Sequence, residues 1–203
     1  MNLFNIFLSA FLIDNVVLMR FLALCPFIGM STDEDKSIGM GLAVTFVTVL
    51  ATAVTYPIYH LVLSRTGILK NILPEGHHGL EFLKILVFIL VIAALVQLVE
   101  FFLKKSAPGL YGAMGIYLAL ITTNCAILAV TFEAIDNGYK FHEAIVYAAG
   151  VALGFLLSLL LLAGIRKRMK TSPVPAFLKG TPILFVAAAL LSIAFMGFKG
   201  LVG

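Results

Sequence analysis

The stretch LFNIFLSAFLIDNVVLMRFLALCPFIGM, from Leu3 to Met30, is a long apolar run that carries Cys25, Pro26 and Gly29 close to its end. It is longer than the roughly 20 apolar residues that span a bilayer as a helix. Proline removes a backbone donor and clashes with the preceding helical turn, and glycine adds conformational freedom. The stretch therefore predicts a membrane helix that is disturbed near Cys25.

The whole chain shares this apolar character. Of its 203 residues, 62% are apolar and only 12% are charged, and the mean hydropathy is +1.10. A soluble domain carries about 25% charged residues, so this chain has too few to coat a water-facing surface. The composition excludes an ordinary cytosolic enzyme, a nucleic-acid-binding module and a disordered chain. It predicts an integral membrane protein.

Six apolar stretches approach or exceed the length of a membrane span. They are Leu3–Met30, Ile38–Leu63, Ile85–Leu103, Gly109–Phe132, Ala144–Ile165 and Pro182–Phe198. The segments between them carry nearly all the charge. We therefore expect an all-α integral membrane protein with six transmembrane helices.

The distribution of Lys and Arg predicts the orientation, because these residues favour cytoplasmic loops. The loops after the first, third and fifth spans hold eight of them, and the other two loops with the C-terminal tail hold five. The run Arg166–Lys170 contributes most of the difference. We expect a multi-pass membrane protein with both termini on the outer face.

A faint internal repeat divides the chain into two halves. A shift of 95 residues lays Glu81–Leu95 on Ala176–Leu190 with seven of fifteen positions identical, and the cysteines at 25 and 125 are separated by nearly the same interval. Three spans in each half would turn the second half upside down relative to the first. The pattern predicts two inverted three-helix repeats, residues 1–105 and 106–203, with a functional site near the midplane between them.

The two cysteines are the candidate site. Cys125 follows Thr122, Thr123 and Asn124, whose side chains can bond the backbone in place of a helical ladder. In straight helices Cys25 would lie at the cytoplasmic end and Cys125 toward the outer face. The thiols can meet only if helices one and four are broken or re-entrant, which is tolerated where the backbone is buried in protein.

Two interpretations of these cysteines remain open. Each is either a small buried apolar residue, as free cysteines often are, or a thiolate ligand of a metal centre. Iron–sulfur clusters usually take four cysteine ligands, and one copy of this chain supplies two. A cluster would therefore need a homologous or identical partner for the other two ligands.

Asp14, Asn15 and Arg20 lie within the first span. Ionisable residues there are rare and often functional, so these three are candidates for an ion path or for pairing with one another or a neighbouring protein of the membrane. The alternative is an interface or snorkelling role.

Glycines at 112, 115, 150 and 154 predict close helix packing. The run Arg166–Lys170 is interpreted as a topology anchor, with docking of a soluble protein or anionic lipid as the alternative.

Several motifs together resemble a known family nearly end to end. They are Asp14–Leu18, Phe21–Gly29, Gly39–Ala43, Leu95–Glu100, Leu120–Ala126 and Ala194–Phe198. They are similar to the family of RnfA proteins, membrane components of the Rnf electron-transport complex, an ion-translocating ferredoxin:NAD⁺ oxidoreductase. The same larger family includes the NqrD and NqrE proteins of the sodium-pumping NADH:quinone oxidoreductase. The tripeptide Cys-Pro-Phe at 25–27 favours the Rnf type.

This resemblance implies an intramembrane [2Fe–2S] cluster shared with a homologous membrane protein of the same complex, RnfE. Carried over by motif, the ligands in this chain would be Cys25 and Cys125, with Pro26, Thr123 and Asn124 as neighbours of the cluster. It further implies that the chain is a membrane component of a redox-driven Na⁺ or H⁺ pump in the bacterial cytoplasmic (inner) membrane. The chain would carry electrons across the membrane, and the pump would couple ferredoxin/NAD⁺ electron transfer to ion translocation.

The resemblance also implies partners, since other Rnf membrane and peripheral subunits would carry flavin and iron–sulfur centres. No phosphate loop, flavin-attachment motif or nucleophile–base pair is visible, so we expect no complete active site in this chain. No nucleic-acid partner is expected. From the residues alone, an inverted-repeat secondary transporter or channel for a small ion or metabolite, without a metal cluster, remains the alternative function.

Overall fold

The computed structural model describes residues 3–31, 34–60, 77–106, 120–121, 124–173, 175 and 178–200. Every regular element in these residues is a helix. In chain order they are α1 (Leu3–Leu8), the π-helix η1 (Ser9–Ile13), α2 (Leu24–Met30), α3 (Glu34–Ile58), α4 (His77–Ser106), α6 (Cys125–Asp136), α7 (Phe141–Met169), α8 (Thr181–Met196) and the 3₁₀ turn η5 (Gly197–Gly200).

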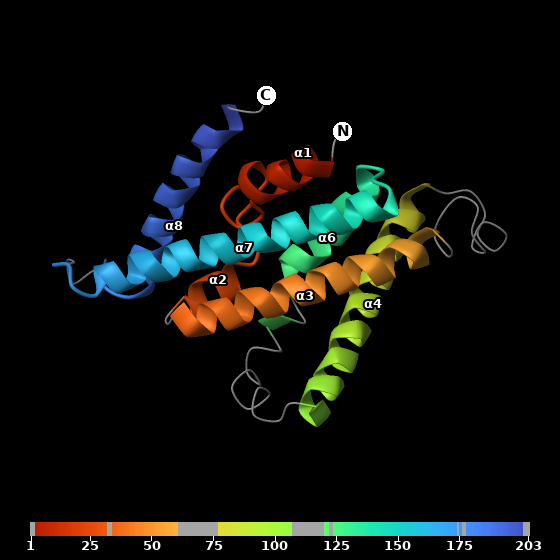
Figure 1. Cartoon of the computed structure of the whole chain (residues 1–203), viewed down its shortest axis with the longest axis horizontal. Coiled ribbons are helices and arrows are strands. Elements are labelled where there is room, and N and C mark those ends of the chain that lie inside the picture. The colour runs from red at the N-terminus through yellow and green to blue at the C-terminus, as the bar shows by residue number, and fades with distance from the viewer. Residues whose placement is uncertain are drawn as a thin grey trace.

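The centre of the molecule is the pair of long helices α3 and α7, which make the most extensive contact (Figure 1). Gly41 of α3 lies directly against the side chain of Leu156, so that a β-carbon at this position would clash with it. Two segments, Ser37–Ile58 and Phe141–Met169, are long and apolar enough to cross a membrane. Shorter apolar helices cover Leu3–Ile13, Ile85–Phe101 and Thr181–Met196.

The first predicted span is broken, as its sequence indicates. Residues 14–23 between η1 and α2 are not helical, and both Phe21 and Ala23 have positive φ angles, +54° and +57°. Pro26 is the third residue of α2. There it occupies the first helical turn, whose N–H groups have no partner within the helix in any case. The helix therefore restarts close to the proline instead of running through it.

Asn15 fixes this break against α7. Its side chain is fully buried, and Nδ2 donates to Gly154 O at 2.8 Å and to Ser158 Oγ at 2.7 Å. Its Oδ1 accepts the backbone N–H groups of Val17 and Leu18 at 3.1 and 3.2 Å. All four hydrogen-bonding positions of the carboxamide are thus used. The helix can end here because the Asn15 side chain makes hydrogen bonds in place of those that the helical backbone no longer makes.

The close packing predicted for Gly150 and Gly154 is confirmed. A β-carbon on Gly154 would lie 2.7 Å from Phe11 O, and one on Gly150 would lie 3.0 Å from Phe7 O and from the β-carbon of Ala10. These two glycines let the backbone of α1 and η1 approach α7 directly. The other two glycines of the predicted pattern, at 112 and 115, lie outside the described residues.

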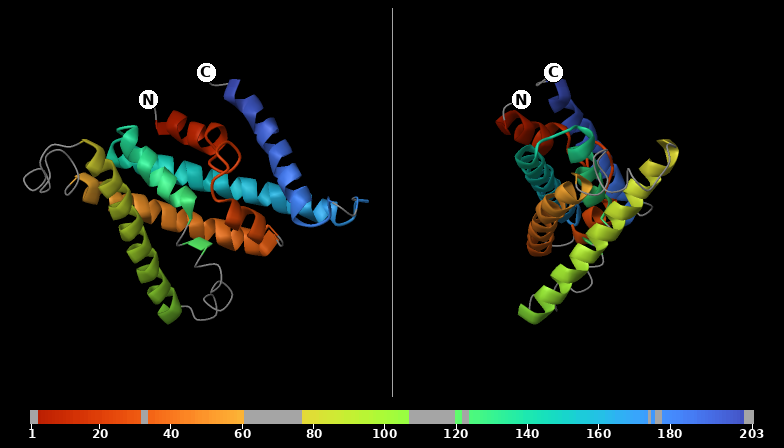
Figure 2. Two further views of the ribbon diagram at one scale, coloured as in Figure 1. Left: turned by 180° about the vertical axis from the view of Figure 1, so that it is seen from behind. Right: turned by 90° about the vertical axis from the view of Figure 1, so that its right-hand side faces the viewer.

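The remaining helices surround this centre. In Figure 2, α4 crosses the end of the α3–α7 pair at a steep angle, while α1 and α8 lie together on one side, close to both ends of the chain. Large apolar side chains remain exposed along α4 and α8, among them Leu90, Leu98, Phe101, Leu190 and Ile193. An exposed apolar surface of this extent fits lipid or a neighbouring membrane protein.

The predicted fourth span, Gly109–Phe132, is described only in part, because residues 107–119, 122 and 123 lie outside the described ranges. Its C-terminal part is α6, which continues to Asp136 and so places Glu133 in a helix where the sequence predicted a loop. The six-span count and the inverted relation of residues 1–105 to 106–203 remain predictions.

Candidate metal-ligand site

Cys25 is the second residue of α2 and Cys125 is the first residue of α6. Both are free thiols and both are exposed on the chain. Each cysteine thus lies in the first turn of a helix that follows a non-helical residue.

Asn124 explains why α6 begins at Cys125. It has extended backbone angles, and its Oδ1 accepts the N–H of Ala126 at 3.0 Å, which makes it the N-cap of α6. The residue is 5% exposed, and Nδ2 has no hydrogen-bond partner among the described residues. A buried donor is therefore unused directly before the cysteine. Thr122 and Thr123 lie outside the described residues.

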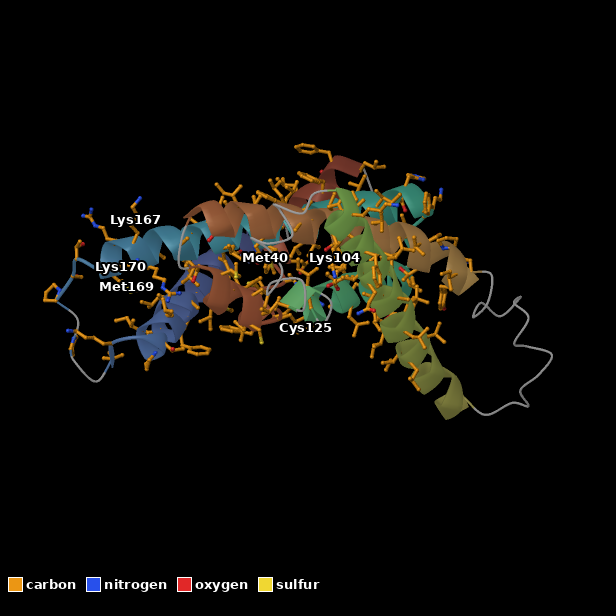
Figure 3. All side chains as sticks on the ribbon, turned by 90° about the horizontal axis from the view of Figure 1, so that it is seen from below. Met40, Lys104, Cys125, Lys167, Met169 and Lys170 are labelled. Carbon is orange, nitrogen blue, oxygen red and sulfur yellow. The ribbon has the colours of Figure 1, made fainter. Side chains whose placement is uncertain are left out.

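The structure brings the two helix starts together. The backbone N–H of Ala23 donates to Sγ of Cys125 at 2.9 Å, across 102 residues of sequence. Ala23 is the N-cap residue of α2 and precedes Cys25 by two positions. In Figure 3, Cys125 lies at the N-terminal end of α6, beside α2. The segment with Cys25 therefore reaches the segment with Cys125, through Ala23.

Cys25 and Cys125 are the candidate ligands of a metal centre. The thiol of Cys125 accepts a hydrogen bond from the residue that precedes α2, and both thiols are exposed. Within the described residues, no group of three or more His, Cys, Asp or Glu side chains could hold a metal ion. Thiolates suit soft metals and iron–sulfur clusters. Two thiols fit a cluster with four cysteine ligands only if a second chain adds two more.

Of the other candidates in the first span, Asp14 ends the π-helix, and its N–H donates to Ser9 O at 2.9 Å. Its carboxylate lies within electrostatic reach of Tyr139 in the turn between α6 and α7. Burial raises the pKa of Tyr139, and the negative charges of Asp14 and Glu143 raise it further. Asp14 therefore belongs to a polar region at the junction of the first helix with α6 and α7.

Arg20 forms an ion pair with Glu133 of α6, within the same chain. The second oxygen of Glu133 accepts the hydroxyl of Tyr147 at 2.6 Å. Sequence reasoning missed Glu133 and Tyr147. Glu133 follows the apolar run of span four and was assigned to a loop, and nothing in a single sequence pairs it with a residue 113 positions earlier.

Known proteins resemble this chain over nearly its whole length. The family model described as "Rnf-Nqr subunit, membrane protein" matches residues 3–202. The A component of the Na⁺-translocating ferredoxin:NAD⁺ oxidoreductase complex of Acetobacterium woodii is 48% identical over 201 residues, covering 99% of this chain and 98% of the relative. The A component of the proton-translocating ferredoxin:NAD⁺ oxidoreductase complex of Clostridium ljungdahlii is 41% identical over 198 residues, covering 98% and 96%.

A third relative, the A component of the ion-translocating oxidoreductase complex of Syntrophotalea carbinolica, is 48% identical over 201 residues, again covering 99% of this chain and 98% of the relative. The similarity thus extends over both helix starts that carry the cysteines and over nearly the whole length of each protein. The chain belongs to the Rnf-Nqr family of membrane subunits.

Proposed function

We propose that this chain is the A component of an ion-translocating ferredoxin:NAD⁺ oxidoreductase complex, and that Cys25 and Cys125 supply two of four ligands to an intramembrane [2Fe–2S] cluster. The other two ligands would come from a homologous membrane protein of the complex. The observation that carries this proposal is the hydrogen bond from Ala23 N–H to Cys125 Sγ, which joins two helix starts that each bear an exposed cysteine.

A [2Fe–2S] cluster supplies one-electron transfer when it is bound. The residues of this chain would hold and polarise its ligands. The Ala23 N–H would donate to the Cys125 ligand, and the start of α6 would orient it. The exposure of both thiols leaves them accessible to a second chain. Asn124 holds the first turn of α6 in place.

The names of the relatives differ in the ion that is transported. One is named for Na⁺ translocation and another for proton translocation, at 48% and 41% identity. The proposal is therefore translocation of Na⁺ or H⁺, coupled to electron transfer between ferredoxin and NAD⁺. We place the chain in the bacterial inner membrane with the Arg166–Lys170 end of α7 on the cytoplasmic side and both termini outside, from the Lys and Arg distribution.

The test is substitution of the cysteines in the purified complex. We expect Cys25→Ser and Cys125→Ser each to lower the iron content by about two atoms per complex and to remove one [2Fe–2S] signal in electron paramagnetic resonance. Ferredoxin-dependent NAD⁺ reduction should fall with it. Ala129→Ser is the matched control, because it adds a hydroxyl to the same helix one turn after Cys125.

Unchanged iron content and spectrum in both cysteine variants would refute the ligand assignment. If ion transport in liposomes also persisted without any iron, the secondary-transporter alternative would replace the proposal. Loss of iron in Ala129→Ser as well would mean that disturbance of α6, and not loss of a ligand, explains the cysteine variants.

A further inference from the structure

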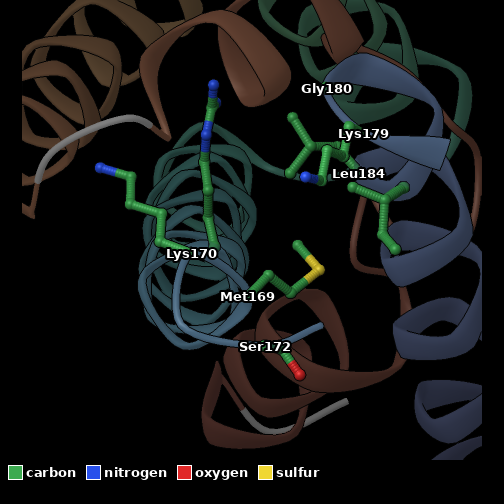
Figure 4. Close-up of a pocket in the computed structure, with 8 residues that line it drawn as sticks. Met169, Lys170, Ser172, Lys179, Gly180 and Leu184 are labelled. Carbon is green, nitrogen blue, oxygen red and sulfur yellow. The ribbon is translucent and has the colours of Figure 1, made fainter. Parts of the chain in front are cut away.

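A cavity of about 290 Å³ lies between the end of α7 and the beginning of α8 (Figure 4). Three cationic side chains line it, Arg166, Lys170 and Lys179, and none of its lining residues in the described part of the chain is acidic. Figure 4 shows Lys170 and Met169 coming from the α7 side and Lys179, Gly180 and Leu184 from the α8 side. Its electrostatic character is therefore strongly positive, at the expected cytoplasmic boundary of the membrane.

The cations of this cavity lack anionic partners among the described residues. There, neither Lys170 nor Lys179 forms an ion pair, and Arg166 uses only Nη1, toward Ile28 O at 3.1 Å and Ser31 Oγ at 3.2 Å. The remaining guanidinium donors of Arg166 stay available. Gly180, the N-cap of α8, provides no side-chain acceptor for the first turn of that helix. The cavity presents several donors and two unneutralised ammonium groups to an anion.

A second cavity of about 380 Å³ continues along the same two helices. Met169 and Ile183 line both cavities, so the two are contiguous. The second is lined only by apolar residues, among them Val186, Leu190 and Ala194 of α8. A basic chamber therefore opens into an apolar groove that follows α8 toward its C-terminal end.

We propose that this composite site binds one anionic phospholipid, with the phosphate headgroup in the basic cavity and an acyl chain in the apolar groove. A free anion would have no use for the groove, and an apolar helix of a partner protein would leave the cations of the cavity unpaired. The size of the basic cavity suits a headgroup, being at the lower end of small-molecule pockets. Basic pockets between transmembrane helices are favourable sites for anionic lipid headgroups.

The site also has a structural link to the candidate metal-ligand site. Arg166 bonds the carbonyl of Ile28 near the end of α2, the helix whose second residue is Cys25. A phosphate on Arg166 would restrict the guanidinium and with it the end of α2. The lipid proposal does not depend on the identity of any metal centre, because it rests on the α7–α8 cavities alone.

The test measures lipid binding to the purified complex that contains the full chain. Phosphatidylglycerol is titrated in detergent, and bound lipid is counted by native mass spectrometry, with phosphatidylcholine and inorganic phosphate as comparison ligands. We expect the double variant Lys170→Gln/Lys179→Gln to lose one bound phosphatidylglycerol per copy of the chain. Its affinity should fall by about 30-fold, from the contribution of each of the two basic residues near an anionic lipid.

Two further variants separate the parts of the site. Lys167→Gln/Arg168→Gln removes two charges from the same helix end outside the cavity, and its affinity should stay within about twofold of the wild type. Ala194→Phe keeps every charge but fills the apolar groove, and it should also lose the bound lipid. If the first double variant fails to assemble, Lys179→Gln alone replaces it.

Four results would overturn the proposal. They are equal loss of lipid in both double variants, unchanged binding in Ala194→Phe, phosphatidylcholine binding as tight as phosphatidylglycerol binding, and inorganic phosphate at millimolar concentration displacing the lipid completely. The first would indicate a general effect of surface charge. The second and fourth would indicate an anion site without an acyl chain.

Discussion

The backbone N–H of Ala23 lies 2.9 Å from Sγ of Cys125 and donates a hydrogen bond to it. Ala23 reaches this position with φ of +57° and ψ of +35°, in the left-handed region. For a residue with a β-carbon this conformation costs about 1 kcal/mol or more. The strain thus lies at the residue that connects the two cysteine-bearing segments, and it can be measured by removing the β-carbon.

We predict that Ala23→Gly is tolerated far better than the same change in a helix. Ala23 and Ala148 of α7 are equally buried, at 2% and 0% exposure, so both lose the packing of one methyl group. At position 23 glycine relieves strain, whereas at 148 it lowers helix propensity. Ala23→Gly should therefore cost at least about 1 kcal/mol less than Ala148→Gly. Circular-dichroism unfolding in detergent measures the difference, and equal costs would contradict the strain.

A second prediction concerns the contact of α7 with the first helix. Gly154→Ala would place a β-carbon 2.7 Å from Phe11 O, a backbone atom that cannot move alone. We expect it to lower the free energy of unfolding by about 1–3 kcal/mol. Gly164→Ala in the same helix meets nothing within 4 Å. It should be neutral or stabilising by up to about 1 kcal/mol. A similar effect of both substitutions would show that the first helix does not pack on Gly154.

A third prediction concerns Asn15, whose four hydrogen bonds hold residues 15–18 against α7. Asn15→Leu keeps the branched shape of the side chain, at a larger volume, but leaves two buried N–H groups and the Gly154–Ser158 acceptors without this partner. We expect a loss of about 3 kcal/mol in unfolding free energy. Ser158→Ala removes one of the four bonds and should cost about 1 kcal/mol.

The matched test for Asn15 is the double variant Asn15→Leu/Ser158→Ala. Because the two residues share a bond, its cost should be smaller than the sum of the single costs. Strict additivity of the two costs in thermal unfolding would mean that Asn15 and Ser158 do not interact. It would contradict the conclusion that Asn15 holds residues 15–18 against α7 through this bond.

The membrane character of the chain and the disturbance near Cys25 could be predicted from the sequence, because both follow from local composition. Twenty apolar residues have few alternatives to a membrane or buried helix, and proline cannot donate within a helix. The close packing of Gly150 and Gly154 also follows from a local pattern. These features need no knowledge of which distant segment lies opposite.

The contacts that residues 14–23 make with α6 and α7 could not be predicted, because they join residues more than 100 positions apart in the sequence. Asn15 was a candidate for an ion path because of its polarity, yet its side chain is occupied by α7 and by the following turn. Phe21 and Ala23 give no sequence signal of positive φ, which glycine would have given. Glu133 was assigned to a loop because a charge after an apolar run ordinarily ends a span.

A fourth prediction addresses the ion pair of Arg20 with Glu133, which joins the broken segment to α6. The side chain of Arg20 is 42% exposed and that of Glu133 is 22% exposed, so solvent screens the pair. A double-mutant cycle with Arg20→Gln and Glu133→Gln should give a coupling energy of about 0.5–1 kcal/mol, decreasing with added salt. A coupling energy of zero at low salt would show that Arg20 pairs elsewhere in the complex.

The last prediction concerns Tyr147, whose hydroxyl donates to the carboxylate of Glu133 at 2.6 Å. Tyr56 provides the matched comparison, because its hydroxyl donates to a neutral acceptor, Tyr139 O, at 2.9 Å. Hydrogen bonds to a charged group are roughly twice as strong as neutral ones. Tyr147→Phe should therefore lower the unfolding free energy by about 2 kcal/mol, and Tyr56→Phe by about 1 kcal/mol. In a Glu133→Gln background the acceptor is neutral, so the cost of Tyr147→Phe should fall to that of Tyr56→Phe. If it stayed at its original value, loss of the hydroxyl itself and not the charge on Glu133 would set the cost of Tyr147→Phe.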